Sequence, residues 1–93
     1  MAVRITHIRM ATGGTRHEHI VSVKWKNEST SETGTSTVAV MVDYIDNKNG
    51  KAYVWDGQYR VEVGTVHPKV GHAYIRTYKD GVWTDNLLAL PRF

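Results

Sequence analysis

The stretch S-T-V-A-V-M-V-D-Y-I-D-N-K-N-G, residues 36–50, decides the fold because it fits two periodicities at once. Apolar residues recur at helical spacing, at Val38, Met41, Val42 and Ile45. They also alternate as in a strand, at Val38, Val40, Val42 and Tyr44, and the β-branched content favours that pattern. The two ends favour the helix, because Ser36 is a good N-cap and K-N-G is typical of a C-terminal glycine cap. We therefore predict a helix over residues 36–48.

The chain before this helix is typical of two strands joined by a glycine loop. Residues 3–10 mix β-branched and polar residues and end at A-T-G-G-T. The segment H-E-H-I-V-S-V-K-W-K then alternates, with Val21, Val23 and Trp25 on the apolar side. This register, carried backwards, places His17 and His19 at the rim of the core. Residues 27–36, N-E-S-T-S-E-T-G-T-S, are predicted to form a mobile polar loop.

The chain after the helix carries two Asp-Gly dipeptides, each typical of a two-residue hairpin turn. Asp56-Gly57 separates A-Y-V-W from Q-Y-R-V-E-V and predicts one shared face, made of Ala52, Val54, Tyr59, Val61 and Val63. Tyr53, Trp55 and Arg60 then lie on the other face. Asp80-Gly81 predicts two cross-strand pairs, Arg76 with Asp85 and Tyr78 with Trp83. The tail N-L-L-A-L-P-R-F is expected to cover the edge of the core.

These elements predict an α+β fold and one domain over residues 1–93. The expected architecture is an antiparallel sheet of about five to six strands packed on one helix, in the order strand, strand, helix, strands. Arg4 and Arg9 interrupt any apolar run near Met1, and no later run reaches membrane-spanning length. We therefore expect a soluble, cytoplasmic protein without a membrane partner. The chain has no cysteine, which excludes disulfides, thiolate catalysis and cysteine-based zinc sites.

The formal charge of +3 and the pI near 9.3 favour anionic partners, although no basic block is present. A small anionic ligand fits this charge as well as nucleic acid does. Signatures of phosphate-binding loops, dinucleotide folds, nucleophile elbows and H-E-x-x-H metalloproteases are missing, and no nucleophile can be assigned.

Two constellations could carry chemistry. His17 and His19, at alternate strand positions, would lie about 7 Å apart, but no third metal ligand stands nearby, so we expect no metal. They could serve as a base or proton donor in a pocket, or bond to loop backbone near G-G-T. Arg76 could grip a phosphate beside Tyr74, Tyr78 and Trp83, or form a surface ion pair with Asp85.

The motifs I-T-H-I-R-M, H-E-H-I-V-S-V-K-W, M-V-D-Y-I, Y-I-R-T and D-N-L-L-A-L-P resemble, nearly end to end, one family of short bacterial and phage proteins. That family is designated domain of unknown function 3892. The resemblance implies that six residues fall within family motifs: His17, His19, Arg76, Thr77, Asp85 and Asn86. It implies no activity, and it suggests a phage or prophage setting.

From these observations we expect a non-catalytic binding protein, not an enzyme, that holds a small anionic, nucleotide-like ligand and needs no cofactor. The candidate ligand-binding residues are His17, His19, Arg76, Thr77, Tyr78, Trp83, Asp85 and Asn86. The alternatives are a module that binds a host protein, a nucleic-acid-binding domain, and a small nucleotide hydrolase with His17 or His19 as general base. A homodimer that joins two shallow sites is compatible with the sequence.

Overall fold

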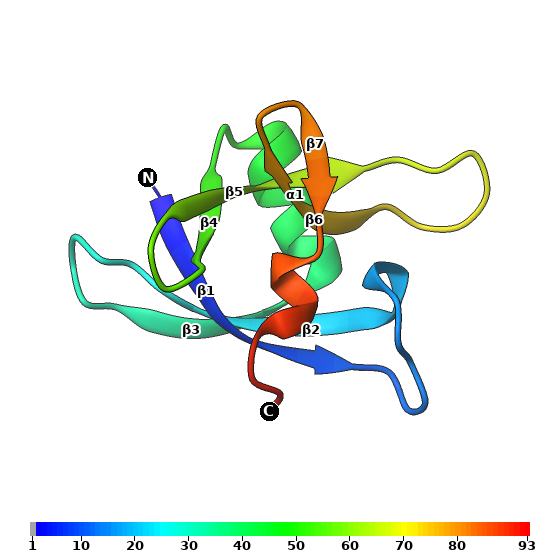
Figure 1. Cartoon of the computed structure of the whole chain (residues 1–93), viewed down its shortest axis with the longest axis horizontal. Helices are drawn as coiled ribbons and strands as arrows, with labels where there is room; N and C mark the ends of the chain where they lie inside the picture. Colours follow the sequence, from blue (N-terminus) through cyan, green and yellow to red (C-terminus); the bar gives the residue numbers. More distant parts are fainter. Residues whose placement is uncertain (1) are drawn as a thin grey trace.

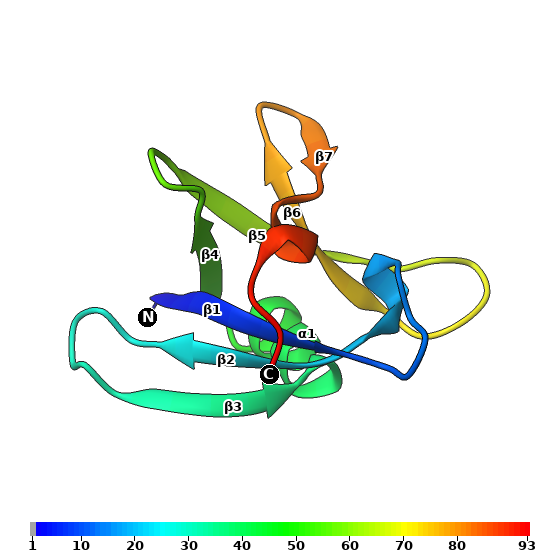
Figure 2. The ribbon, with the colours of Figure 1, turned by 60° about the horizontal axis from the view of Figure 1, so that its bottom comes forward.

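The structure, a computed structural model, describes residues 2–93 and contains one sheet of seven strands in the order β3-β2-β1-β4-β5-β6-β7 (Figure 1). The elements in chain order are β1 Ala2–Met10, η1 His17–His19, β2 Ile20–Lys26, β3 Thr33–Thr37, α1 Val38–Asn47, β4 Lys51–Trp55, β5 Arg60–Val66, β6 Tyr74–Lys79, β7 Val82–Thr84 and η2 Asn86–Ala89. Figures 1 and 2 show α1 on one side of the sheet, with the strands curving around it. The predicted α+β class is confirmed.

The sheet is mixed, so the prediction of an antiparallel sheet with five to six strands was only partly right. β1 and β4 run parallel over Ala2–Arg4 and Lys51–Tyr53, whereas every other neighbouring pair is antiparallel. The helix is the reason, because it carries the chain from β3 across the sheet before β4 begins. A helical crossover is the usual way to join strands that point in the same direction.

The predicted helix is confirmed with shifted ends. α1 begins after Thr37, whose hydroxyl accepts the Val40 N–H at 3.3 Å. The expected cap, Ser36, instead accepts a hydrogen bond from the Trp25 indole at 3.0 Å. Beyond the last turn, Asn49 adopts a positive φ of 54°, and the Gly50 N–H donates to the Tyr44 carbonyl at 2.9 Å.

The predicted mobile loop over residues 27–36 was wrong in its second half, because β3 occupies Thr33–Thr37. Its T-G-T-S-T sequence has no apolar residue that would mark a strand. β3 pairs only with β2, as an edge strand whose register runs from Lys26 opposite Thr33 to Ser22 opposite Thr37. Threonine is favoured on the half-exposed surface of a strand. The strand is therefore held by its hydrogen bonds to β2 and not by an apolar face of its own.

The predicted inward alternation of Val21, Val23 and Trp25 was wrong for Val21, whose side chain is 42% exposed. Ile20 and Val23 are buried instead. The pairing of β1 with β2 slips between Arg9 opposite Ser22 and Met10 opposite Ile20, so Val21 is an extra residue on β2. Such a bulge reverses the alternation on one side of it, and period two cannot be extended through it.

The second hairpin turn is confirmed, and the first is longer than predicted. Asp80 and Gly81 both have positive φ, and Lys79 pairs with Val82. In the first hairpin Trp55 pairs with Arg60, so four residues, 56–59, form the loop. Asp56 accepts the N–H groups of residues 58 and 59 at 2.8 and 2.6 Å, which stabilises this wider turn. Tyr59 therefore lies in the loop and is exposed, not on the core face.

The tail covers the core as predicted. Leu87 in η2 is fully buried. β4 pairs with β1 only as far as Arg4. Further along β1, the tail pairs with the same edge: the Ile8 N–H donates to the Pro91 carbonyl at 3.0 Å, and the Ile8 carbonyl accepts from the Phe93 N–H at 3.1 Å. Figure 2 shows this tail crossing β1. No helix within residues 2–93 is long and apolar enough to cross a membrane.

Candidate functional site

A polar pocket of about 310 Å³ lies where η1 meets β6 and the segment after β7. Three predicted site residues, His17, Arg76 and Asp85, line it. The remaining lining residues are Thr15, Arg16, Glu18, Tyr74 and Leu88. The front and back motifs of the sequence thus converge, although they are more than fifty residues apart. We call this hollow the polar pocket.

Asp85 connects the two motifs. Its Oδ1 accepts from the Arg76 Nη2 at 2.9 Å and lies 3.8 Å from the His17 Nε2. The Arg76 Nε donates to the Thr84 carbonyl at 3.1 Å, so the guanidinium is held at two points. The predicted pair of Arg76 with Asp85 is confirmed. The Arg76 Nη1 has no hydrogen-bond partner among residues 2–93 and remains able to donate.

His17 is buried, with 7% of its surface exposed. Its Nε2 is the one buried side-chain nitrogen or oxygen in the described residues that lacks a hydrogen bond. Burial lowers the pKa of His17 below its usual 6.5, the nearby Arg76 charge lowers this pKa further, and Asp85 and Glu18 act in the opposite direction. The imidazole is therefore held neutral beside a carboxylate. Unsatisfied buried polar groups are rare and often mark functional sites.

His17 should make the folded protein less stable in acid. Because its pKa is lower in the folded state, its contribution is full above pH 6.5, the unfolded value, and is lost as pH falls through the folded pKa. We expect the free energy of unfolding, measured with urea at several pH values from 7.5 down to 5, to fall less for His17→Gln than for wild type. Parallel curves for wild type and His17→Gln would contradict this assignment.

His19 does not enter the polar pocket. The predicted strand register was wrong here, because residues 17–19 form a short 3-10 helix ahead of β2. The His19 Nδ1 accepts the N–H groups of Thr15 and Arg16 at 3.0 and 3.1 Å. A side chain at Gly14 would collide with the His19 Cβ, so glycine permits this tight turn. His19 thus closes the loop, as the backbone-bonding alternative predicted.

Thr77 and Asn86 form a buried hydroxyl network instead of lining the polar pocket. The Thr77 hydroxyl donates to the Thr84 carbonyl at 3.0 Å and accepts the Asn86 N–H at 3.1 Å. The single Thr84 hydroxyl proton lies between two acceptors, Thr77 Oγ1 and Asn86 Oδ1, both 2.6 Å away. Thr77 is completely buried. This network holds the chain where it turns from β7 into η2, and so positions Asp85.

Tyr78 and Trp83 also lie outside the polar pocket. They pair across the second hairpin with ring centroids 5.2 Å apart in an edge-to-face contact, and each is more than 40% exposed. Sequence reasoning missed Arg16 and Glu18 as pocket residues, because a strand over residues 17–19 would point Glu18 away from the histidines, and nothing local marked Arg16. Tyr74 was expected only as an aromatic neighbour of Arg76, two residues along the same face of β6.

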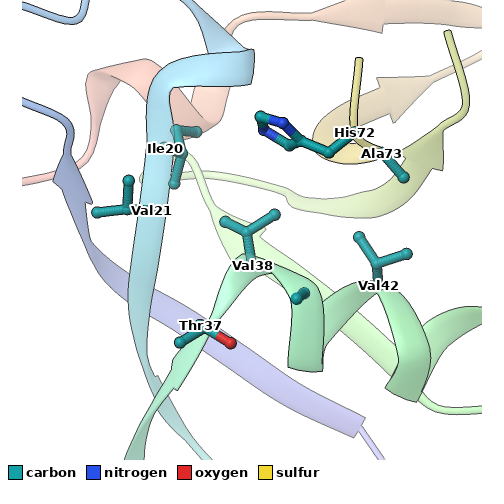
Figure 3. Close-up of a pocket in the computed structure, with 8 residues that line it drawn as sticks. Ile20, Val21, Thr37, Val38, Val42, His72 and Ala73 are labelled. Atoms are coloured by element: carbon teal, nitrogen blue, oxygen red, sulfur yellow. The ribbon is translucent and has the colours of Figure 1, made fainter. Parts of the chain in front are cut away.

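A second hollow, of about 410 Å³, is apolar. Val38 and Val42 project into it from α1, and the His72 ring lies across from them (Figure 3). It offers few polar groups, so the polar pocket is the better candidate for specific recognition. No group of three or more metal-ligating side chains occurs within residues 2–93.

These features define a class of small α+β proteins in which a curved seven-stranded sheet surrounds one helix and a polar pocket joins the front of the chain to its last hairpin. Residues 4–91 match the family described as protein of unknown function DUF3892, and the chain belongs to that family. Comparison with curated proteins and with solved structures produced no match.

Proposed function

We propose that this protein is a non-catalytic binding protein whose polar pocket holds the anionic group of a nucleotide-like ligand. The observation that carries the proposal is the convergence of His17, Arg76 and Asp85 around a buried nitrogen without a partner. The Arg76 Nη1 and the exposed guanidinium of Arg16 would bind phosphate oxygens. Tyr74, which also lines the polar pocket, offers an aromatic face for the base.

Binding is favoured over catalysis by the surroundings of His17. Its Nε2 lies toward the carboxylate of Asp85 and has no hydrogen bond to the Thr15 hydroxyl, the one hydroxyl nucleophile of the aliphatic type among the lining residues. The pocket is shallow and carries two guanidinium groups and two carboxylates. A ligand phosphate would compete with Asp85 and Glu18 for the two arginines, which favours a ligand of high negative charge.

The proposal has a concrete version in the cell. In a phage or prophage setting, a cytoplasmic protein of this kind would sequester a nucleotide signal of the host. The rival reading, a module that binds a host protein, is favoured by the exposed aromatic side chains of Trp55, Tyr59, Tyr78 and Trp83. A pull-down from host lysate with wild type and Trp83→Ala would identify that case. A homodimer would appear in the mass measured by light scattering.

Isothermal titration with cyclic and linear nucleotides tests the ligand directly. We expect heat from at least one nucleotide, and Arg76→Ala should weaken its affinity about 10- to 150-fold, because charge-assisted hydrogen bonds contribute roughly 1.5–3 kcal/mol. Arg60→Ala is the matched control, since Arg60 also pairs with a carboxylate, Glu62 at 3.1 Å, but lies outside the polar pocket. If no nucleotide gives heat, or if both variants lose equally, the proposal fails.

A further inference from the structure

β1 and β2 together carry a group of positive charges. Four cationic side chains, Arg4, Arg9, Lys24 and Lys26, lie on these two strands, and Arg4 pairs with Glu28. We call these four residues the basic surface. None of the Asp and Glu residues of the chain lies on β1 or β2, so the Lys and Arg side chains of these two strands have no acidic side chain between them.

The strand register places these cations side by side. Arg4 lies directly opposite Lys26, and Lys24 lies opposite His7. Like charges directly opposite each other destabilise a sheet. Glu28 reaches Arg4 at 3.4 Å, but Arg9, Lys24 and Lys26 have no ion pair within the described residues. The pairing of Arg4 with Lys26 therefore does not stabilise the sheet, whereas a polyanion bound across both side chains would neutralise their charges.

The basic surface is hollowed and rich in hydrogen-bond donors. A depression of about 340 Å³ is lined by Lys24, Lys26 and the threonines Thr6, Thr33 and Thr35. Hydroxyl and ammonium groups are the usual donors to the phosphate oxygens of nucleic acids. The Phe93 ring lies 4.7 Å from the Arg9 guanidinium and 5.0 Å from the Lys24 ammonium, so it keeps both cations at the surface.

The same row of paired residues continues from cations to aromatic rings. Across the sheet it runs Thr33, Lys26, Arg4, Tyr53, Glu62, Tyr78 and Trp83, one residue from each of the seven strands. Tyr53 is covered by the Arg60 guanidinium at 4.0 Å, but Tyr78 and Trp83 are exposed. Exposed aromatic faces stack on unpaired bases. A duplex offers no such faces, so this combination favours a single strand.

We propose that the basic surface binds the phosphate backbone of single-stranded nucleic acid, and that unpaired bases reach Tyr78 and Trp83 at the other end of the row. None of these residues lines the polar pocket, so the inference stands apart from the function proposed for that pocket. Because the sheet is curved, a bound nucleic-acid strand would wrap around the molecule as it runs from β3 towards β7 (Figures 1 and 2).

Fluorescence anisotropy with a labelled oligothymidylate tests this proposal. For three to four phosphate contacts, the logarithm of the association constant should fall against the logarithm of salt concentration with a slope of about −2 to −3. Lys24→Glu and Lys26→Glu should each reduce affinity roughly tenfold at low salt and make the slope shallower by about 0.7. Lys69→Glu makes the same charge change in an exposed loop and should stay within about twofold of wild type.

The stability of Lys26→Glu separates a binding role from a structural one. The new carboxylate would face Arg4 across the strands, so the melting temperature should stay equal or rise while binding falls. The proposal is overturned if wild type does not bind the oligonucleotide at low salt, or if Lys69→Glu weakens binding as much as Lys26→Glu does. Equal affinity for the same sequence as a duplex would overturn the assignment to single strands.

Discussion

Replacing Leu87 by alanine is expected to lower the free energy of unfolding by about 2–5 kcal/mol, the usual loss for a fully buried leucine. Leu87 has no exposed surface and belongs to the core cluster that includes Ile8 and Ile75. The short 3-10 helix η2 has few hydrogen bonds of its own, so this side chain anchors η2 in the core, while hydrogen bonds to Ile8 hold the chain further along. Urea unfolding monitored by tryptophan fluorescence measures the change.

Leu90→Ala is the matched control for Leu87→Ala, because the same atoms are removed from a residue that is only partly buried against the core. Leu90→Ala should lower the free energy of unfolding clearly less than Leu87→Ala does. An equal loss for both variants, or a loss below about 1 kcal/mol for Leu87→Ala, would show that η2 does not complete the core.

Thr77→Val is expected to destabilise the protein by about 2–4 kcal/mol, although the two side chains have nearly the same shape. The Asn86 N–H would lose its acceptor, and the Thr84 hydroxyl would lose one of its two partners, next to a side chain that is completely buried. Thr77→Ser keeps the hydroxyl and should cost about 1 kcal/mol, mainly for the lost methyl group. Thermal unfolding of the three proteins measures this order.

The same pair of variants tests whether Thr77 binds ligand. A residue that contacts ligand would lose affinity at unchanged stability when its hydroxyl is removed. A residue that holds the turn before η2 would lose stability first, and the affinity of the polar pocket would fall only because Asp85 is no longer positioned. If Thr77→Val unfolds at the wild-type temperature, the network does not have the role given to it here.

Local signals predicted those parts of the fold that depend on local chemistry. The Asp80-Gly81 turn needs two positive φ angles, and these residue types allow them at small cost. The helix was predicted from its capping residues, although Thr37 took the place of Ser36. Asp56-Gly57 gave the same signal as the second turn, but Asp56 hydrogen-bonds two backbone N–H groups and so forms a longer loop. A dipeptide cannot distinguish these two outcomes.

Features that depend on distant pairing could not be predicted. β3 has no apolar residue and exists because β2 pairs with it. The bulge at Val21 depends on how β1 and β2 meet, and the 3-10 helix over residues 17–19 ends the strand before it reaches the histidines. The sequence also could not predict that Arg76 and His17 line one pocket, because their meeting depends on how distant strands pair. Half of the basic surface could be predicted, because Lys24 and Lys26 alternate with core residues on β2. Its other half, Arg4 and Arg9, lies on β1, and only the pairing of the two strands brings these cations together.

The bridge from the tail to Ile8 has a consequence for synthesis of the protein on the ribosome. β1 is made long before the tail, yet its edge at Ile8 receives its hydrogen bonds from residues 91 and 93, which are translated more than eighty residues later. Contacts of such long sequence separation form late and slowly. Until they form, the nascent chain presents an open strand edge next to an unfilled space for Leu87. Unpaired strand edges and exposed apolar surface favour aggregation, so we expect this interval to be the one in which the chain associates wrongly.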